Sequence, residues 1–129
     1  MKVTSFGEVL WDDFPSGKVL GGAPLNVLVR LQSFGVDTAI ISRRGDDADG
    51  EELLRQIQAK NVNTDLLQVC KECDTSLVKV ILDKCGSASY EIVYPCAWDR
   101  IIVEDAALQR VAESDAFGFG SLATRDEIS

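Results

Sequence analysis

The sequence of 129 residues contains no histidine, and this absence removes several classes of functional site at once. Histidine supplies the base of most catalytic triads and is the commonest metal ligand in proteins. Basic residues are also few, because 13 Lys and Arg stand against 21 Asp and Glu and give a formal net charge of −8. Proteins that bind nucleic acids normally present a basic face to the phosphates. The composition therefore argues against a histidine-dependent enzyme and against a nucleic-acid partner.

The chain also lacks any long hydrophobic stretch. No run approaches the roughly 20 consecutive apolar residues that span a membrane as a helix. Residues 1–8 reach Gly7 and Glu8 too soon for a secretory signal peptide. With 46% hydrophobic and 26% charged residues, the composition is that of one globular domain. We therefore expect a cytoplasmic protein with no membrane partner.

The four cysteines, Cys70, Cys73, Cys85 and Cys96, have the number but not the spacing of a zinc site. The first two form a C-x-x-C pair, whereas the last two do not. Cysteine packs readily as a small apolar residue, and without a signal peptide a disulfide framework is not expected. We predict no bound metal here, and a zinc or thiol-redox module is kept as an alternative function.

Three aspartates before the second predicted helix, Asp46, Asp47 and Asp49, also suggest a metal site at first sight. Negative charge is favoured at a helix N-terminus, because it complements the helix dipole. This preference explains the three aspartates without a metal.

Apolar residues along the chain predict alternating strands and helices with a β-rich section between them. The expected strands cover 1–10, 18–20, 38–42, 66–70, 75–83, 87–94 and 115–120, and a turn is expected over 11–17. The expected helices cover 24–34, 50–60 and 104–113. Asp49 and Glu52 are expected to form a capping box at the start of the second helix. This order predicts an α/β domain with a layered parallel sheet. The strands between 66 and 94 predict an antiparallel excursion from it.

Two glycines directly precede the first predicted helix, in the segment Gly21-Gly22-Ala23-Pro24-Leu25-Asn26. Pro24 suits the first helical turn, because its missing N–H costs little there. The first N–H groups of a helix have no partner within it, and glycines let a ligand approach the backbone closely. The segment therefore predicts a small-molecule site, although a tight turn into the helix also explains the glycines.

Several motifs together resemble the PfkB/ribokinase family of carbohydrate kinases, and its fructokinase-like branch most closely. The matching motifs, which follow one another in the family's order, are Gly7-Glu8-Val9-Leu10-Trp11-Asp12, Gly21–Asn26, Arg44-Gly45-Asp46-Asp47 with Gly50, Ala97-Trp98-Asp99 and Phe119-Gly120-Ser121-Leu122. The resemblance implies a ribokinase-like fold, in which helices flank a parallel sheet. It also implies one domain over 1–129, with lid strands at about 12–20 and 66–96 inserted in the α/β core.

The resemblance further implies which residues bind the substrate, a small-molecule sugar. Asp12 would accept hydrogen bonds from sugar hydroxyls at a strand end, although it also suits an ordinary turn. The other residues of the implied sugar site are Gly21, Gly22, Asn26, Tyr94, Trp98 and Ser121. Helix capping is the alternative for Asn26 and Ser121, and packing against the domain is the alternative for the aromatic residues. Pro95 stands where members often carry an arginine that reaches the substrate.

The activity implied by the resemblance is the transfer of a phosphoryl group from ATP, with Mg²⁺, to a primary hydroxyl of a ketohexose such as fructose. The family places its catalytic aspartate in a Gly-Ala-Gly-Asp motif far along the chain, and this motif does not occur here. We therefore expect an N-terminal part of a longer kinase, inactive alone and able to form a homodimer through the lid. The alternatives are a kinase of another sugar, a sugar acid or a nucleoside, and a binding or interaction module that catalyses nothing.

Overall fold

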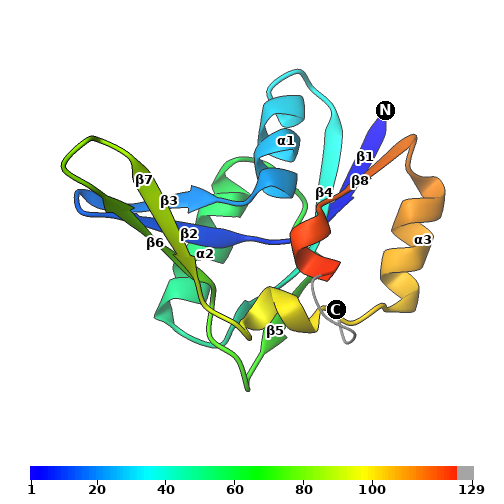
Figure 1. The fold of residues 1–129 in the computed structure, drawn as a ribbon. Helices are drawn as coiled ribbons and strands as arrows, with labels where there is room; N and C mark the ends of the chain where they lie inside the picture. The colour runs from blue at the N-terminus through cyan, green and yellow to red at the C-terminus, as the bar shows by residue number, and fades with distance from the viewer. Residues whose placement is uncertain (125–129) are drawn as a thin grey trace.

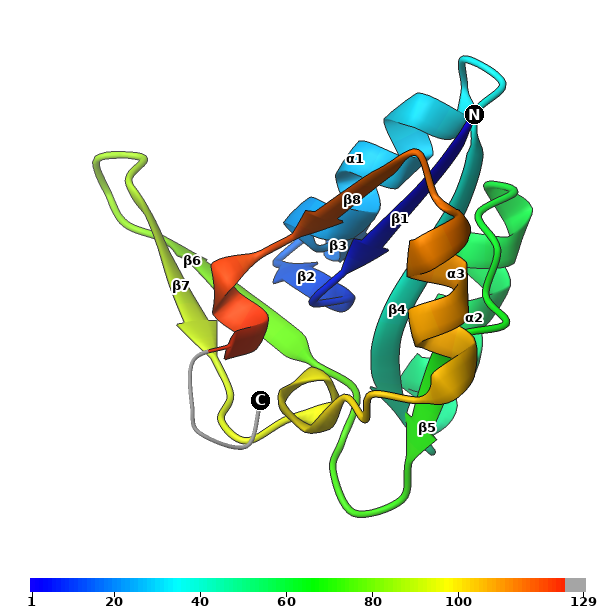
Figure 2. The same ribbon diagram turned by 90° about the vertical axis from the view of Figure 1, so that its right-hand side faces the viewer.

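The structure is a computed structural model that describes residues 1–124, and its main layer is a parallel sheet (Figure 1). The strands of this sheet are β1 (Lys2–Phe6), β4 (Asp37–Gly45), β5 (Leu67–Cys70) and β8 (Ala116–Phe119). They lie in the order β5-β4-β1-β8, and every pairing between them is parallel. Figure 2 shows β8 beside β1, although the two are far apart in the sequence. The sheet confirms the predicted α/β class.

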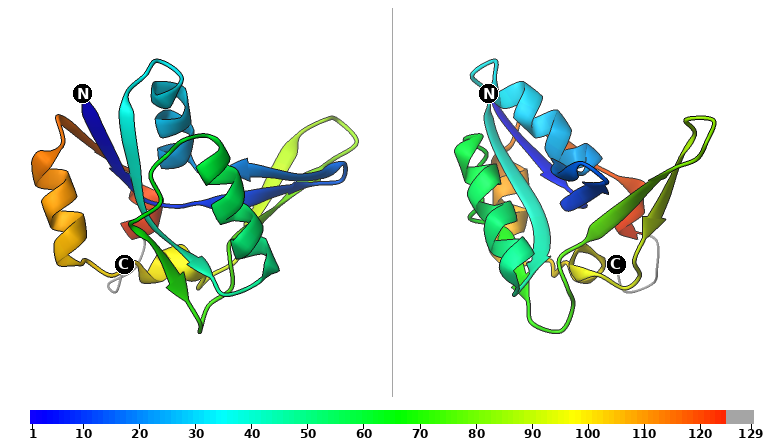
Figure 3. Two further views of the ribbon diagram at one scale, coloured as in Figure 1. Left: turned by 180° about the vertical axis from the view of Figure 1, so that it is seen from behind. Right: turned by 90° about the vertical axis from the view of Figure 1, so that its left-hand side faces the viewer.

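A second sheet, which we call the projecting sheet, extends away from this core. Its strands are β2 (Leu10–Phe14), β3 (Gly17–Gly21), β6 (Leu77–Leu82) and β7 (Ala88–Ile92), in the order β3-β2-β6-β7. β2 and β3 form one antiparallel hairpin, β6 and β7 form another, and β2 runs parallel to β6. Both views of Figure 3 show the β6–β7 hairpin reaching beyond the helices and the first sheet.

Helices cover both faces of the parallel sheet. They are α1 (Ala23–Gln32), α2 (Ala48–Ala59) and α3 (Asp105–Glu113), with two short 3₁₀ helices, η1 (Ala97–Arg100) and η2 (Ser121–Thr124). Val3 of β1 is buried in one cluster with Leu25 of α1 and Leu53 of α2. Phe6 points to the opposite face, because side chains alternate along a strand, and with α3 it lines an apolar cavity of about 190 Å³. Within residues 1–124, none of the helices has the length and apolar character needed to cross a membrane.

Trp11 attaches the projecting sheet to the core. Its side chain is buried in the same cluster as Leu28 of α1 and Ile57 of α2. Its indole Nε1 donates a hydrogen bond of 3.0 Å to the carbonyl oxygen of Asp49 in α2. Large aromatic side chains dominate core energetics, and a buried indole N–H normally needs such a partner. The root of β2 is therefore fixed against α2.

The structure corrects several of the predicted strands. Leu67–Cys70 pairs with β4 in the parallel sheet, so it does not belong to the excursion. The predicted turn over 11–17 contains most of β2 and the start of β3, because the chain leaves β1 at Gly7 rather than at Trp11. The excursion is a mixed sheet rather than an antiparallel one. A short apolar run indicates a strand, but it carries no information about which strand it pairs with.

The start of α2 also differs from the prediction. The N-cap is Asp47, whose carboxylate accepts a hydrogen bond of 2.7 Å from the N–H of Gly50. Asp49 lies inside the first turn, so the predicted capping box of Asp49 and Glu52 is wrong. The extended backbone of Asp47 places its side chain over the free N–H groups, which is the geometry that N-capping requires.

Candidate functional site

Asp12 and Gly21 lie against each other where the β2–β3 hairpin meets the core. Asp12 pairs with Val19, and Leu10 pairs with Gly21. A Cβ atom on Gly21 would lie only 2.5 Å from Oδ2 of Asp12. The carboxylate therefore occupies the space that any side chain at position 21 would need. Burial in this position raises the pKa of the Asp12 carboxyl.

Gly22 follows directly and is the N-cap of α1. Its φ of 114° suits glycine, and a Cβ atom here would lie 2.4 Å from the carbonyl oxygen of Glu8. No side chain caps the helix, and its first turn carries no acidic residue. Pro24 lies in that first turn, as predicted. Asn26 lies one turn into the helix with an exposed side chain, and its backbone N–H bonds to the oxygen of Gly22 at 2.9 Å.

These neighbours place complementary hydrogen-bonding groups on either side of the double glycine. The Asp12 carboxylate supplies acceptor oxygens beside Gly21. The uncapped N-terminus of α1 supplies N–H donors at Gly22, where no partner exists within the helix. A ligand with several hydroxyl groups can use both, because a hydroxyl both donates and accepts.

The aspartate-rich loop before α2 is used in the fold itself. Asp47 accepts hydrogen bonds from the backbone N–H of Thr75 at 3.0 Å and from its hydroxyl at 2.6 Å. Burial alone would raise the pKa of Asp47, but the hydrogen bonds from Thr75 and Gly50 outweigh it and lower the pKa. Asp49 forms an ion pair of 3.0 Å with Lys18. Across residues 1–124, no three or more side chains of metal-ligating type form a group that could hold an ion.

An open cavity of about 500 Å³ borders this loop, between Asp47, the start of β6 and the segment after β7. Asp12 and Gly21 do not line it. Two of its three aspartates, Asp47 and Asp49, already bond to other parts of the protein. We therefore place the candidate ligand site at Asp12 rather than in this cavity.

The cysteines are free thiols in the structure. Cys70 and Cys96 are buried, and Cys85 is exposed in the turn between β6 and β7. Burial raises the pKa of the Cys73 thiol, and a hydrogen bond with Cys70 raises it further. A raised pKa keeps a thiol protonated and less nucleophilic, so the pair gives no support to a thiol-redox function.

The sequence pattern of the pfkB family of carbohydrate kinases matches residues 7–95. The chain belongs to this family. It is 32% identical over 102 residues to a sugar kinase of Pyrococcus horikoshii, covering 79% of this chain and 33% of that protein. It is 30% identical to Fructokinase-2 of Zea mays, covering 97% of this chain and 41% of that protein.

Solved structures of sugar kinases share the fold of this pfkB-family chain. A crystal structure of the Pyrococcus sugar kinase has a TM-score of 0.84 and 29% identity, over 94% of this chain and 45% of that one. Fructokinase of Halothermothrix orenii has a TM-score of 0.84 and 26% identity, over 98% of this chain and 49% of that one. Another structure of the Pyrococcus kinase is a complex with ATP. The chain therefore spans less than half the length of these relatives.

The sugar site implied for this pfkB-family chain also includes Tyr94 and Ser121, which follow the double glycine in the sequence. Tyr94 follows β7 and is exposed, and the guanidinium of Arg100 lies 6.0 Å from the centroid of its ring. The backbone of Ser121 begins η2, but its side chain lies outside the described part of the structure. The sugar contacts implied for these two residues stay predictions.

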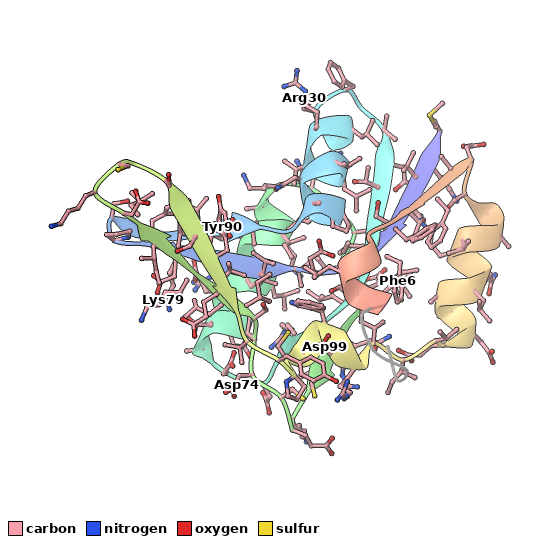
Figure 4. All side chains as sticks on the ribbon, viewed as in Figure 1. Phe6, Arg30, Asp74, Lys79, Tyr90 and Asp99 are labelled. Atoms are coloured by element: carbon pink, nitrogen blue, oxygen red, sulfur yellow. The ribbon has the colours of Figure 1, made fainter. Side chains whose placement is uncertain are left out.

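Trp98 is a core residue in the structure. Its side chain is completely buried and packs with Cys96 and Ala123, with Phe6 against the same cluster. Figure 4 shows Phe6 and Asp99, the neighbour of Trp98 in η1, close to η2. Trp98 therefore contributes to packing in this structure, and the sugar contact implied for it stays a prediction. Aromatic residues after a strand carry no sequence signal that separates these roles.

Two residues in this region were given no role from the sequence. Thr75 is the hydrogen-bond partner of Asp47, and an isolated threonine after a loop gives no signal of such a distant contact. Glu8 is only 5% exposed. The sequence does indicate that Glu8 is buried, because this glutamate between Gly7 and Val9 interrupts an otherwise apolar segment. Buried glutamates are rare and need a partner.

Proposed function

We propose that this chain forms the sugar-binding side of an ATP-dependent kinase that phosphorylates a primary hydroxyl of a ketohexose such as fructose. The observation that carries the proposal is the Asp12 carboxylate packed on Gly21 beside the uncapped N-terminus of α1. The carboxylate accepts hydrogen bonds from sugar hydroxyls, and the helix N–H groups donate to sugar oxygens. The exposed side chain of Asn26, one turn into α1, adds an amide to the same site. The relatives named as fructokinases support fructose as the first sugar to test.

The projecting sheet is proposed as a lid over the sugar. Cross-strand partners share a face, so Asp12, Val19 and Ile92 lie on the same face through the pairings of β3, β2, β6 and β7. Tyr90, two residues from Ile92, lies on that face as well, and its side chain is exposed. Figure 4 labels Tyr90 on β7 and Lys79 on β6, which by alternation belong to opposite faces. An apolar face over the ligand excludes water, which phosphoryl transfer requires.

The catalytic half of the reaction is proposed to reside outside these residues. The sequence contains no Gly-Ala-Gly-Asp motif, so we expect no turnover of ATP by the 129-residue chain alone. In the complete reaction an aspartate base would activate the sugar hydroxyl, and charge on the transferred phosphoryl group would be neutralised with the help of Mg²⁺. The ATP complex of the Pyrococcus relative supports ATP as the donor.

A coupled assay of ADP release tests the proposal, applied to the 129-residue chain and to any longer product of its gene. The substrates are fructose, ribose, a six-carbon sugar acid and a nucleoside. We expect a longer product to use fructose and the 129-residue chain to use none of them. Turnover with only another member of the panel would transfer the assignment to that substrate. Sugar binding without turnover by any longer product would favour a binding module instead.

A further inference from the structure

One carboxylate oxygen of Glu8 is buried and lacks a hydrogen-bond partner within residues 1–124. The residue lies between β1 and β2 and is 5% exposed. Its Oε2 atom is fully buried and has no hydrogen-bond partner in the described part of the chain. An ionised carboxylate loses its hydration when it is buried, and it needs a donor or a cation in exchange.

The surroundings of this carboxylate place it at the same end of the sheet as the candidate sugar site. A Cβ atom on Gly120, just after β8, would lie 3.1 Å from Oε2 of Glu8 and 3.4 Å from Cγ of Pro24 in the first turn of α1. The backbone oxygen of Glu8 lies against Gly22, the N-cap of the same helix. Glu8 therefore lies between the end of β8 and the start of α1, next to the double glycine.

Three basic side chains of the described residues bond to groups other than Glu8. Arg44 bonds to the oxygen of Gly45, Lys18 pairs with Asp49, and Arg110 bonds to Thr4. The ion pairs that the structure records within residues 1–124 do not include Glu8. The position at the ligand end of the sheet favours a bound molecule as the donor.

We propose that Glu8 is a second carboxylate of the sugar site, which accepts a hydrogen bond from a hydroxyl of the bound sugar on the α1 side. This inference rests on the proposed sugar-binding function. Asp12 contacts one hydroxyl beside Gly21, and Glu8 contacts another near Gly22 and Gly120. The site thereby selects ligands with hydroxyl groups in both positions. An analogue that lacks one of these hydroxyls binds much more weakly, because it leaves a buried acceptor without a hydrogen bond.

The test is a calorimetric titration of the 129-residue chain with fructose and its mono-deoxy analogues, comparing wild type, Glu8→Gln and the control Glu72→Gln. Glu72 is exposed, so its substitution removes the same charge from the surface. We expect Glu8→Gln to weaken fructose binding about tenfold or more. Without sugar it should also melt at or above the wild-type temperature, because it removes a carboxylate whose buried oxygen lacks a hydrogen-bond partner. The mono-deoxy analogue that lacks the hydroxyl contacted by Glu8 should bind wild type weakly. Glu8→Gln should weaken the binding of this analogue little further. Glu72→Gln should bind as wild type does.

Equal fructose binding by wild type and Glu8→Gln would overturn the inference and leave the sugar site intact. A lower melting temperature of Glu8→Gln with unchanged affinity would do the same, since it would show a structural partner. If Glu8→Gln does not fold, wild type labelled with ¹³C at glutamate carboxyls decides, because the Glu8 signal must shift on saturation with fructose. An unshifted signal contradicts the inference. Absence of binding by wild type to any sugar would instead refute the proposed function, and the inference with it.

Discussion

The carboxylate of Asp47 and the hydroxyl of Thr75 are joined by a hydrogen bond of 2.6 Å, which links the N-terminus of α2 to the segment that enters β6. The same hydroxyl accepts a bond of 2.9 Å from the N–H of Gly45 at the end of β4. β6 is the strand that connects the β6–β7 hairpin to β2. This small network therefore sets where half of the projecting sheet meets the parallel sheet.

Removal of the Thr75 hydroxyl is expected to destabilise the chain. Thr75→Val leaves the N–H of Gly45 without its acceptor and removes one of the hydrogen bonds to Asp47, which costs about 1–3 kcal/mol when such groups are buried. Urea denaturation followed by circular dichroism measures the change in the free energy of unfolding. Thr75→Ser keeps the hydroxyl and should retain most of the stability. Equal stability of Thr75→Val and wild type would show that the network does not hold the sheet.

Asp47 is expected to make stability depend on pH in the acid range. Burial alone would raise its pKa, but the hydrogen bonds from Thr75 and Gly50 lower it below its unfolded-state value. The stabilisation is present above the unfolded-state pKa, which is about 4, and is lost as pH falls through the lower folded-state pKa. Denaturation between pH 7 and pH 2 should show this loss in wild type and a flatter profile in Asp47→Asn. The exposed neighbour is the control, and Asp46→Asn should follow wild type.

Substitution of Gly21 should act through Asp12. In Gly21→Ala the new Cβ would lie 2.5 Å from Oδ2 of Asp12, so the carboxylate must move. We expect Gly21→Ala to lower both the free energy of unfolding and the affinity for fructose. In the Asp12→Ala background the same substitution should cost less stability, because the colliding atoms are gone. A double-mutant cycle by denaturation measures this coupling, and additive effects would contradict the contact.

The exposed apolar face of the projecting sheet should make the chain self-associate. Val19, Tyr90 and Ile92 lie on this face and are exposed to solvent. Exposed apolar patches commonly mark interaction surfaces. Light scattering after size-exclusion chromatography should show dimers or larger species that diminish in Val19→Ser/Ile92→Ser. The control pair Val27→Ser/Leu108→Ser removes exposed apolar groups from the helices α1 and α3. A monomer at high concentration would argue against a lid-mediated homodimer.

Most of the helices and strands could be predicted from the sequence, because hydrophobic periodicity and turn residues depend on local sequence. The helix after Gly22, with Pro24 in its first turn, needed only the spacing of apolar residues and the tolerance of a helix start for proline. Leu67–Cys70 was assigned to the wrong sheet, since pairing with β4 depends on contacts distant in the sequence. The N-cap was misplaced for a related reason, because three nearby aspartates could each cap and Thr75 selects Asp47.

The candidate site was predictable only where backbone geometry determines it. The closeness of Asp12 and Gly21 follows from a hairpin whose glycine leaves room for a carboxylate. Trp98 shows the limit, because an aromatic residue beside a lid suits ligand contact and core packing equally, and its packing with Cys96 and Ala123 depends on contacts that the local sequence does not specify. Glu8 was missed because burial of a single charged residue depends on β8 and α1 together.

The most direct test of the sugar-binding account is a calorimetric titration of fructose into wild type, Asp12→Asn and Asp13→Asn. Asp13 follows Asp12 on the same strand and points to the opposite face, so it is a matched control. Burial raises the pKa of Asp12, because removal from water disfavours the charged form relative to an exposed aspartate. We expect Asp12→Asn to stay folded at pH 7 and to bind fructose about tenfold more weakly or worse, while Asp13→Asn binds as wild type does. Equal affinities of the three proteins, or no heat of binding with wild type, would contradict the account.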